Sequence, residues 1–326
     1  MVIAIHSALY PMVLYPWLRI AVPLFFMISS YFLFSKLRDS SAEEQKRTLK
    51  KFAIRNLQLY ACWFVILLPI TLHIRRDLYS SPEIFRNIIR IVRSVLFGST
   101  FFASWYIVAT VIGVLIVYYL SRFLRNNFVL FLIVLAAFCM VTLDSSYQAV
   151  IEDTFIGAGI RGYKHIFGGL VNSYPASLFW VFIGKIIAEH KLKLKSSLLI
   201  VLSVLAAAAL YLEWRFVISL DGSYNNDSYF MLAPLCVFLF LAIEQIKPIQ
   251  WKYGVYLRRA STVFYVSHGS VLPVVKKLLE IVLHIKCPPV AFLITFVCCI
   301  IIYGAIELAI QICQKRKICK VLKMLY

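Results

Sequence analysis

Long apolar runs separated by short polar segments dominate this chain. Nine of the runs approach the roughly 20 residues that an α-helix needs to cross a bilayer. They lie at 18–35, 53–72, 104–120, 127–144, 174–189, 197–218, 229–247, 260–280 and 288–312. A tenth run, 1–13, is short, and we interpret it as a truncated first span, with the true N-terminus expected upstream of Met1. The pattern predicts an all-α, polytopic integral membrane protein with about ten transmembrane helices.

The composition agrees with a membrane protein and excludes soluble enzymes. Hydrophobic residues make up 62% of the 326 residues, charged residues 15%, and the mean hydropathy is +0.83. A soluble domain is about half apolar and a quarter charged, so one water-facing globule cannot bury this much apolar surface. Because the polar segments are too short for a second domain, we predict a single transmembrane domain over residues 1–326. The sequence carries no motif of a nucleotide-binding, zinc or serine enzyme, and we expect no metal.

The net charge of +19, from 34 basic and 15 acidic residues, is explained by topology and predicts no nucleic-acid partner. Basic loops that flank membrane spans lie in the cytoplasm, and residues 36–55 form the densest basic cluster. Alternation from this cluster places four more segments in the cytoplasm: 121–126, 190–196, 248–259 and 313–326. The predicted partner of the chain is therefore a lipid bilayer.

The predicted outer segment 73–103 is an exception, because it is rich in arginine. Its apolar residues Ile84, Ile88, Ile91 and Val95 recur at helical spacing. We expect an amphipathic helix here, lying on the outer surface of the membrane.

Ionisable residues inside a membrane cost several kcal/mol unless they pair or line a wet cavity, so they are the candidates for chemistry. His6 lies in the first apolar run, and its imidazole could accept a proton from a hydroxyl group. A hydrogen bond between helices would also explain it. Arg19 opens the second span, four residues before Pro23, which removes a backbone hydrogen bond. Arg19 could line a cavity at this kink, or its side chain could reach the outer interface.

Three polar residues at the start of the third span share one helix face. Lys51, Arg55 and Gln58 are spaced at i, i+4 and i+7. We place them at the N-terminal end of a helix, where partial positive charge favours a bound anion. They could therefore hold a phosphorylated ligand, or the basic pair could simply anchor the span in the cytoplasm.

Two further ionisable residues lie in late spans. His268 follows a Ser-rich, aromatic segment, and a structural hydrogen bond to a neighbouring helix is the simplest interpretation. Glu307 lies in the last span, where pairing with a base is expected. From the residues alone, an enzyme using a cytosolic anionic donor and a transporter both fit the chain.

Several segments resemble the membrane acyltransferase 3 family. The segment from Arg19 to Phe34 (RIAVPLFFMISSYFLF) is similar to the family's second span, and residues 2–6 (VIAIH) to the end of its first. Residues 103–106 (ASWY) and 261–268 (STVFYVSH) are similar to two later family segments in the same order. The resemblance extends over essentially the whole chain.

The resemblance implies a transferase in the cell (cytoplasmic) membrane that moves an acyl group, usually acetyl, from acyl-CoA as co-substrate. The acceptor would be a hydroxyl group of a cell-envelope polysaccharide or lipid-linked sugar. His6 matches the family histidine that acts in proton transfer, and Arg55 matches an arginine that handles acyl-CoA. Lys51 and Gln58 would assist Arg55, while Arg19 and His268 would bind substrate or support the site.

Three positions depart from the family pattern. The arginine expected eleven residues before His6 would precede Met1, the second arginine of the third span is Gln58, and the usual glycine is Ser30. The alternatives to acyl transfer are a transporter or flippase of a lipid-linked saccharide and an inactive family member.

Overall fold

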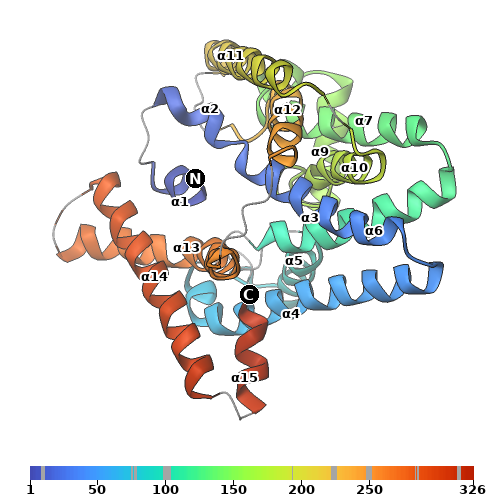
Figure 1. Cartoon of the computed structure of the whole chain (residues 1–326). Helices are drawn as coiled ribbons and strands as arrows, with labels where there is room; N and C mark the ends of the chain where they lie inside the picture. Colours follow the sequence, from blue (N-terminus) through green and yellow to red (C-terminus); the bar gives the residue numbers. More distant parts are fainter. Residues whose placement is uncertain are drawn as a thin grey trace. The chain divides into compact units, whose positions relative to one another are not determined.

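All elements in the described part of the chain are helices, as predicted (Figure 1). The computed structural model describes residues 1–8, 12–74, 76, 79–97, 104–192, 194–221, 226–246, 252–282, 284, 286–313 and 317–326. In chain order the helices are α1 Val2–Ser7, η1 Met12–Leu14, α2 Tyr15–Leu18, α3 Ala21–Arg38, α4 Ala42–Ile74, α5 Ile84–Phe97, α6 Trp105–Leu124, α7 Asn127–Ser145, α8 Gln148–Ile151, α9 Phe155–Phe167, α10 Pro175–His190, α11 Ser196–Asp221, α12 Leu232–Glu244, α13 Gly254–Val282, α14 Pro288–Ile312, α15 Lys317–Leu322 and η3 Lys323–Leu325.

Six helical segments among the described residues are long and apolar enough to cross a membrane, which confirms the polytopic class. They are Tyr15–Arg38, Ala42–His73, Trp105–Leu124, Asn127–Ser145, Ser196–Leu220 and Pro288–Ile312. The predicted count of about ten is not confirmed.

Three predicted spans correspond to helices that do not meet this standard. The runs 174–189 and 229–247 form α10 and α12, of 16 and 13 residues. At 1.5 Å per residue, α12 is roughly 20 Å long, shorter than the roughly 30 Å hydrocarbon core. The run 260–280 lies within α13, which has charged residues near both ends. Of the first run, α1 takes up six residues, while residues 9–11 lie outside the described part.

The chain divides into two compact units that interleave in sequence. Unit 1 comprises residues 1–11, 54–104 and 249–326, and unit 2 comprises residues 12–53 and 105–248. The predicted single domain over residues 1–326 stays a prediction.

Helix α10 is the centre of unit 2 and packs against α3, α6 and α7. Its Gly184 lies so close to α3 that a Cβ atom there would be 2.1 Å from Oγ of Ser30 and 2.6 Å from the carbonyl oxygen of Met27. The Ser30 hydroxyl is fully buried and donates to the carbonyl oxygens of Phe26 and Met27. A small residue on each helix therefore permits close helix–helix packing, as membrane helices require.

Unit 1 is built around α13 and α14, with α1 packed against both (Figure 1). Leu272, Val275 and Leu279 of α13 form a buried cluster with Ala291 of α14. Nη1 of Arg259 in α13 lies 3.2 Å from Oε1 of Glu307 in α14, which confirms the predicted pairing of this glutamate.

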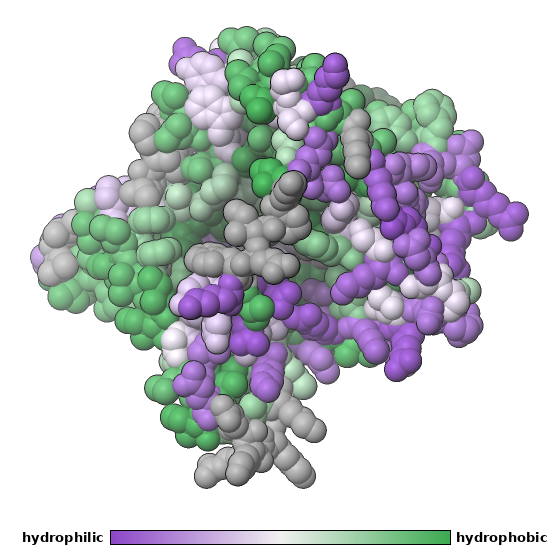
Figure 2. Space-filling model, in the orientation of Figure 1, coloured by the Kyte–Doolittle hydropathy of each residue, from purple (hydrophilic) through white to green (hydrophobic). Residues whose placement is uncertain are grey.

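Helix α5 confirms the amphipathic helix expected in segment 73–103. Its apolar side chains are largely exposed, with Ile84 at 77% and Ile88 at 51%. Figure 2 shows hydrophobic side chains over large parts of the visible face, and hydrophilic ones gathered where α3 ends and α4 begins. The location of α5 on the membrane surface stays a prediction.

Candidate active site around two histidines

The structure brings two of the predicted site residues together in unit 1. His6 lies in the last turn of α1, and His268 lies in the middle of α13. Their rings are stacked, with centroids 5.4 Å apart and planes inclined by 27°. This contact is possible because the short helix α1 packs directly against α13 and α14.

His268 is held in one orientation by its own helix. The side chain is fully buried, and Nδ1 lies 3.0 Å from the carbonyl oxygen of Phe264 and 2.7 Å from that of Tyr265. A carbonyl oxygen can only accept, so Nδ1 carries a proton, and in the neutral ring Nε2 then carries the lone pair. The prediction of a hydrogen bond to a neighbouring helix is therefore wrong, because the acceptors lie one turn back on α13 itself.

The second ring nitrogen of His268 is unusual. Nε2 is buried and has no hydrogen-bond partner within the described residues. Buried polar atoms are nearly always paired, and exceptions call for an explanation. The ring stacks on His6, which is only partly buried, so the pair combines a fixed inner imidazole with an outer one closer to the surface.

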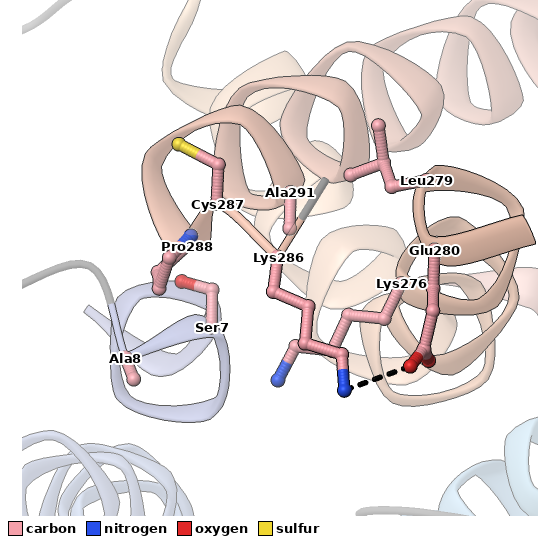
Figure 3. Close-up of a pocket in the computed structure, with 9 residues that line it drawn as sticks. All are labelled: Ser7, Ala8, Lys276, Leu279, Glu280, Lys286, Cys287, Pro288 and Ala291. Carbon is pink, nitrogen blue, oxygen red and sulfur yellow. Dashed lines mark ion pairs between the residues drawn. The ribbon is translucent and has the colours of Figure 1, made fainter. Parts of the chain in front are cut away.

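A cavity of about 340 Å³ lies beside the end of α1, between Ser7 and Ala8 on one side and the end of α13 and the start of α14 on the other (Figure 3). Nζ of Lys276 is 3.1 Å from the backbone carbonyl oxygen of His6. Nζ of Lys286 is 2.8 Å from Oε1 of Glu280. We did not predict this cavity, although Lys276 and Lys277 inside the apolar run 260–280 were a usable signal.

Arg19 lies in unit 2, in the break between α2 and α3. Its guanidinium forms an ion pair with Asp227 and lies 4.3 Å from the ring centroid of Tyr15. Only 13% of the side chain is exposed. The ion pair and the stacking favour a structural role over a free arginine at the interface, and its predicted role towards substrate stays a prediction.

The donor residues predicted on the third span lie on α4, and their local setting differs from our expectation. This helix begins at Ala42, so Lys51 and Arg55 are well inside it, not at its N-terminus. Free N–H groups occur only in the first turn of a helix, so the predicted contribution of the helix end is wrong. Lys51, Arg55 and Gln58 are all exposed, and no ion pair holds them in the described part of the chain. Their binding of acyl-CoA stays a prediction.

Comparisons with known proteins identify a matching family profile and two relatives of this chain. The profile of a family described as an acyltransferase domain matches residues 1–306. An amino-acid racemase of Enterococcus faecalis is 30% identical over 104 residues, which are 32% of this chain and 14% of the racemase. A serine/alanine racemase of Enterococcus gallinarum is 22% identical over 237 residues, which are 72% of this chain and 33% of the racemase.

These two relatives are much longer than the part that matches. The chain spans a third or less of their length, so their names describe proteins with much additional sequence. No solved structure matches the chain. Because the family profile covers nearly all of the sequence, the chain belongs to the acyltransferase 3 family.

Proposed function

We propose that this membrane acyltransferase moves an acetyl group from acetyl-CoA to a hydroxyl group of a cell-envelope polysaccharide or a lipid-linked sugar. The observation that supports this best is the stacked pair of His6 and His268. Acyl transfer to a hydroxyl needs a group that accepts the hydroxyl proton. A partly buried imidazole, fixed by a second one, is suited to that task.

The proposed reaction assigns the proton to His6. Its imidazole removes the proton from the acceptor hydroxyl while the oxygen attacks the thioester carbonyl carbon. The new C–O bond forms, the C–S bond breaks, and His6 returns the proton to the leaving thiolate. His268 contacts neither reactant in this scheme and acts as a positioning residue, because its stacked ring limits the orientations of the His6 ring.

The donor phosphates are assigned to α4. Lys51, Arg55 and Gln58 occupy one face of this helix and are exposed. Arginine binds phosphate through several parallel hydrogen bonds, which makes Arg55 the strongest candidate. We place the protein in the cytoplasmic membrane, where this face would meet cytosolic acetyl-CoA.

The test is mass spectrometry of envelope glycan from cells that carry the intact gene, His6→Ala or His165→Ala, at matched protein levels. His165 is an exposed histidine of α9 in unit 2 and serves as the control. We expect an acetyl mass increment with the intact chain and with His165→Ala, and none with His6→Ala. A general base contributes about a hundred- to ten-thousand-fold to a rate, which is enough to remove the signal.

Each other outcome is informative. An increment that persists in His6→Ala would remove this residue from catalysis. No increment with the intact chain would favour a transporter or an inactive protein.

The variant His268→Phe tests positioning, because a phenyl ring keeps the stacking and loses the nitrogens. We expect His268→Phe to retain more transfer activity than His268→Ala. Equal loss in both variants would mean that the His268 nitrogens take part directly.

A further inference from the structure

The cavity beside α1 carries more positive than negative charge. Lys276, Lys286 and Glu280 all contribute side chains to its lining (Figure 3). The ammonium of Lys286 and the carboxylate of Glu280 offset each other at 2.8 Å. Lys276 has no carboxylate partner within the described residues, and its Nζ contacts only the carbonyl oxygen of His6. One positive charge in the cavity is therefore left unbalanced.

The rest of the lining offers little to a neutral ligand. The other lining residues are small or apolar: Ser7, Ala8, Leu279, Cys287, Pro288 and Ala291. None of the described lining residues is aromatic, so a sugar ring finds no surface on which to stack. Charge is thus the main feature by which this cavity can select a ligand. Its volume of about 340 Å³ is within the usual range of small-molecule sites, about 300–1,000 Å³.

The cavity lies beside the backbone of the proposed base, whose imidazole is not among the described lining residues. Ser7 follows His6 in the chain and lines the cavity, and Lys276 bonds the backbone of His6. A ligand held here lies at the same end of α1 as the His6 imidazole. The hydrogen bond and ion pair with Glu280 also raise the pKa of Lys286, which keeps its ammonium charged at neutral pH.

We propose that this cavity binds the acidic group of the acceptor, so that the acceptor is a phosphorylated or carboxylated sugar and not a neutral one. This inference rests on the proposed function, in which His6 activates the acceptor hydroxyl. Lys276 supplies the main contact to the anion, and Lys286 supplies a second contact that competes with its bond to Glu280.

The experiment measures binding directly, with the full-length protein in lipid nanodiscs and saturation-transfer NMR. The probes are glucose 1-phosphate, glucuronate and glucose, which separate phosphate, carboxylate and neutral ligands. We expect one of the charged probes to bind at least about tenfold more tightly than glucose, because a hydrogen bond to a charged group contributes about 1.5–3 kcal/mol. Higher salt should weaken this binding, since the site is open to solvent.

Variants then locate the site. Lys276→Gln and Lys286→Gln should weaken binding of the charged probe, and the loss should be about tenfold for Lys276→Gln. Glu280→Gln should strengthen this binding. The matched control is Lys277→Gln, which removes the same charge from the neighbouring exposed position outside the cavity lining. An equal loss in Lys276→Gln and Lys277→Gln, or equal binding of glucose and the charged probes, would overturn the proposal.

Two further results separate this inference from the proposed function. If Lys276→Gln weakens binding of acetyl-CoA and leaves binding of the charged sugars unchanged, the cavity binds the donor and the acceptor assignment is wrong. If the charged probe binds as expected while no glycan is acetylated by the intact chain, the anion site stands and the transferase reaction fails.

Discussion

The carboxylate of Glu213 should be a major contributor to the stability of unit 2. It lies in α11, and its Oε1 accepts from the backbone N–H of Phe230 at 2.7 Å and from the hydroxyl of Tyr147 at 2.8 Å. Its Oε2 accepts from the backbone N–H of Met231 at 2.7 Å. Met231 is the N-cap of α12, so these backbone donors have no acceptor within the helix. Glu213 thereby joins α11, α12 and the segment after α7.

The magnitude follows from the number of bonds. Hydrogen bonds to a charged group contribute about 1.5–3 kcal/mol each, and the sum is reduced because Glu213 is only partly buried and water can replace some of them. We expect Glu213→Ala to lower the free energy of unfolding by about 3–5 kcal/mol. Glu213→Gln keeps one acceptor oxygen and should cost about 2 kcal/mol, and Tyr147→Phe, which removes one bond, about 1 kcal/mol.

The assay is unfolding of the purified protein by SDS titration in mixed micelles, followed by tryptophan fluorescence. Asp153→Asn is the control, because Asp153 is an exposed acid beside α8. From most to least destabilised, the expected order of the variants is Glu213→Ala, Glu213→Gln and Tyr147→Phe. It would be refuted by a Glu213→Gln variant as stable as the unchanged protein, since the charge would then contribute nothing.

Three further predictions concern packing, pairing and donor binding. Gly184→Val should destabilise the protein by at least about 1–3 kcal/mol in the same assay, because the new side chain meets α3, whereas Gly304→Val, with open space around it, should not. A double-mutant cycle with Glu307→Gln and Arg259→Gln should give a coupling energy of about 0.5–3 kcal/mol, and additive effects would contradict the pairing. Arg55→Ala should raise the acetyl-CoA concentration needed for half-maximal transfer by about tenfold, and an unchanged dependence would remove Arg55 from donor binding.

Span boundaries could be predicted where the sequence contains both an apolar run and a stop signal. The run 127–144 corresponds to α7, which starts after Asn126, whose side chain accepts from two backbone N–H groups. The run 288–312 coincides with α14, which begins with two prolines. Hydropathy did not predict where α4 begins, because its first turns contain strong helix formers such as Ala42, Glu43 and Gln45 but few apolar residues. The helix therefore starts eleven residues before the predicted run.

The individual residues of the candidate site could be predicted from the sequence, but their arrangement could not. His6 and His268 were identified because each is an ionisable group in an apolar run, but nothing in the sequence encodes the contact between their rings. That contact depends on how α1 packs on α13 and α14. Glu213 was missed because its role is to cap a helix that begins in another segment, which only the folded chain brings near.

The stacked geometry indicates which of the two histidines would carry the transferred proton. Two positive charges 5.4 Å apart repel each other by about 3 kcal/mol at an effective dielectric constant of 20. His268 is fully buried and has no carboxylate partner within the described residues, so burial disfavours a positive charge on its ring. His6 is nearer the surface and lies beside the cavity in which we place the acceptor. The proton taken from a hydroxyl should therefore reside on His6, and the neutral ring of His268 keeps the base oriented without competing for that proton.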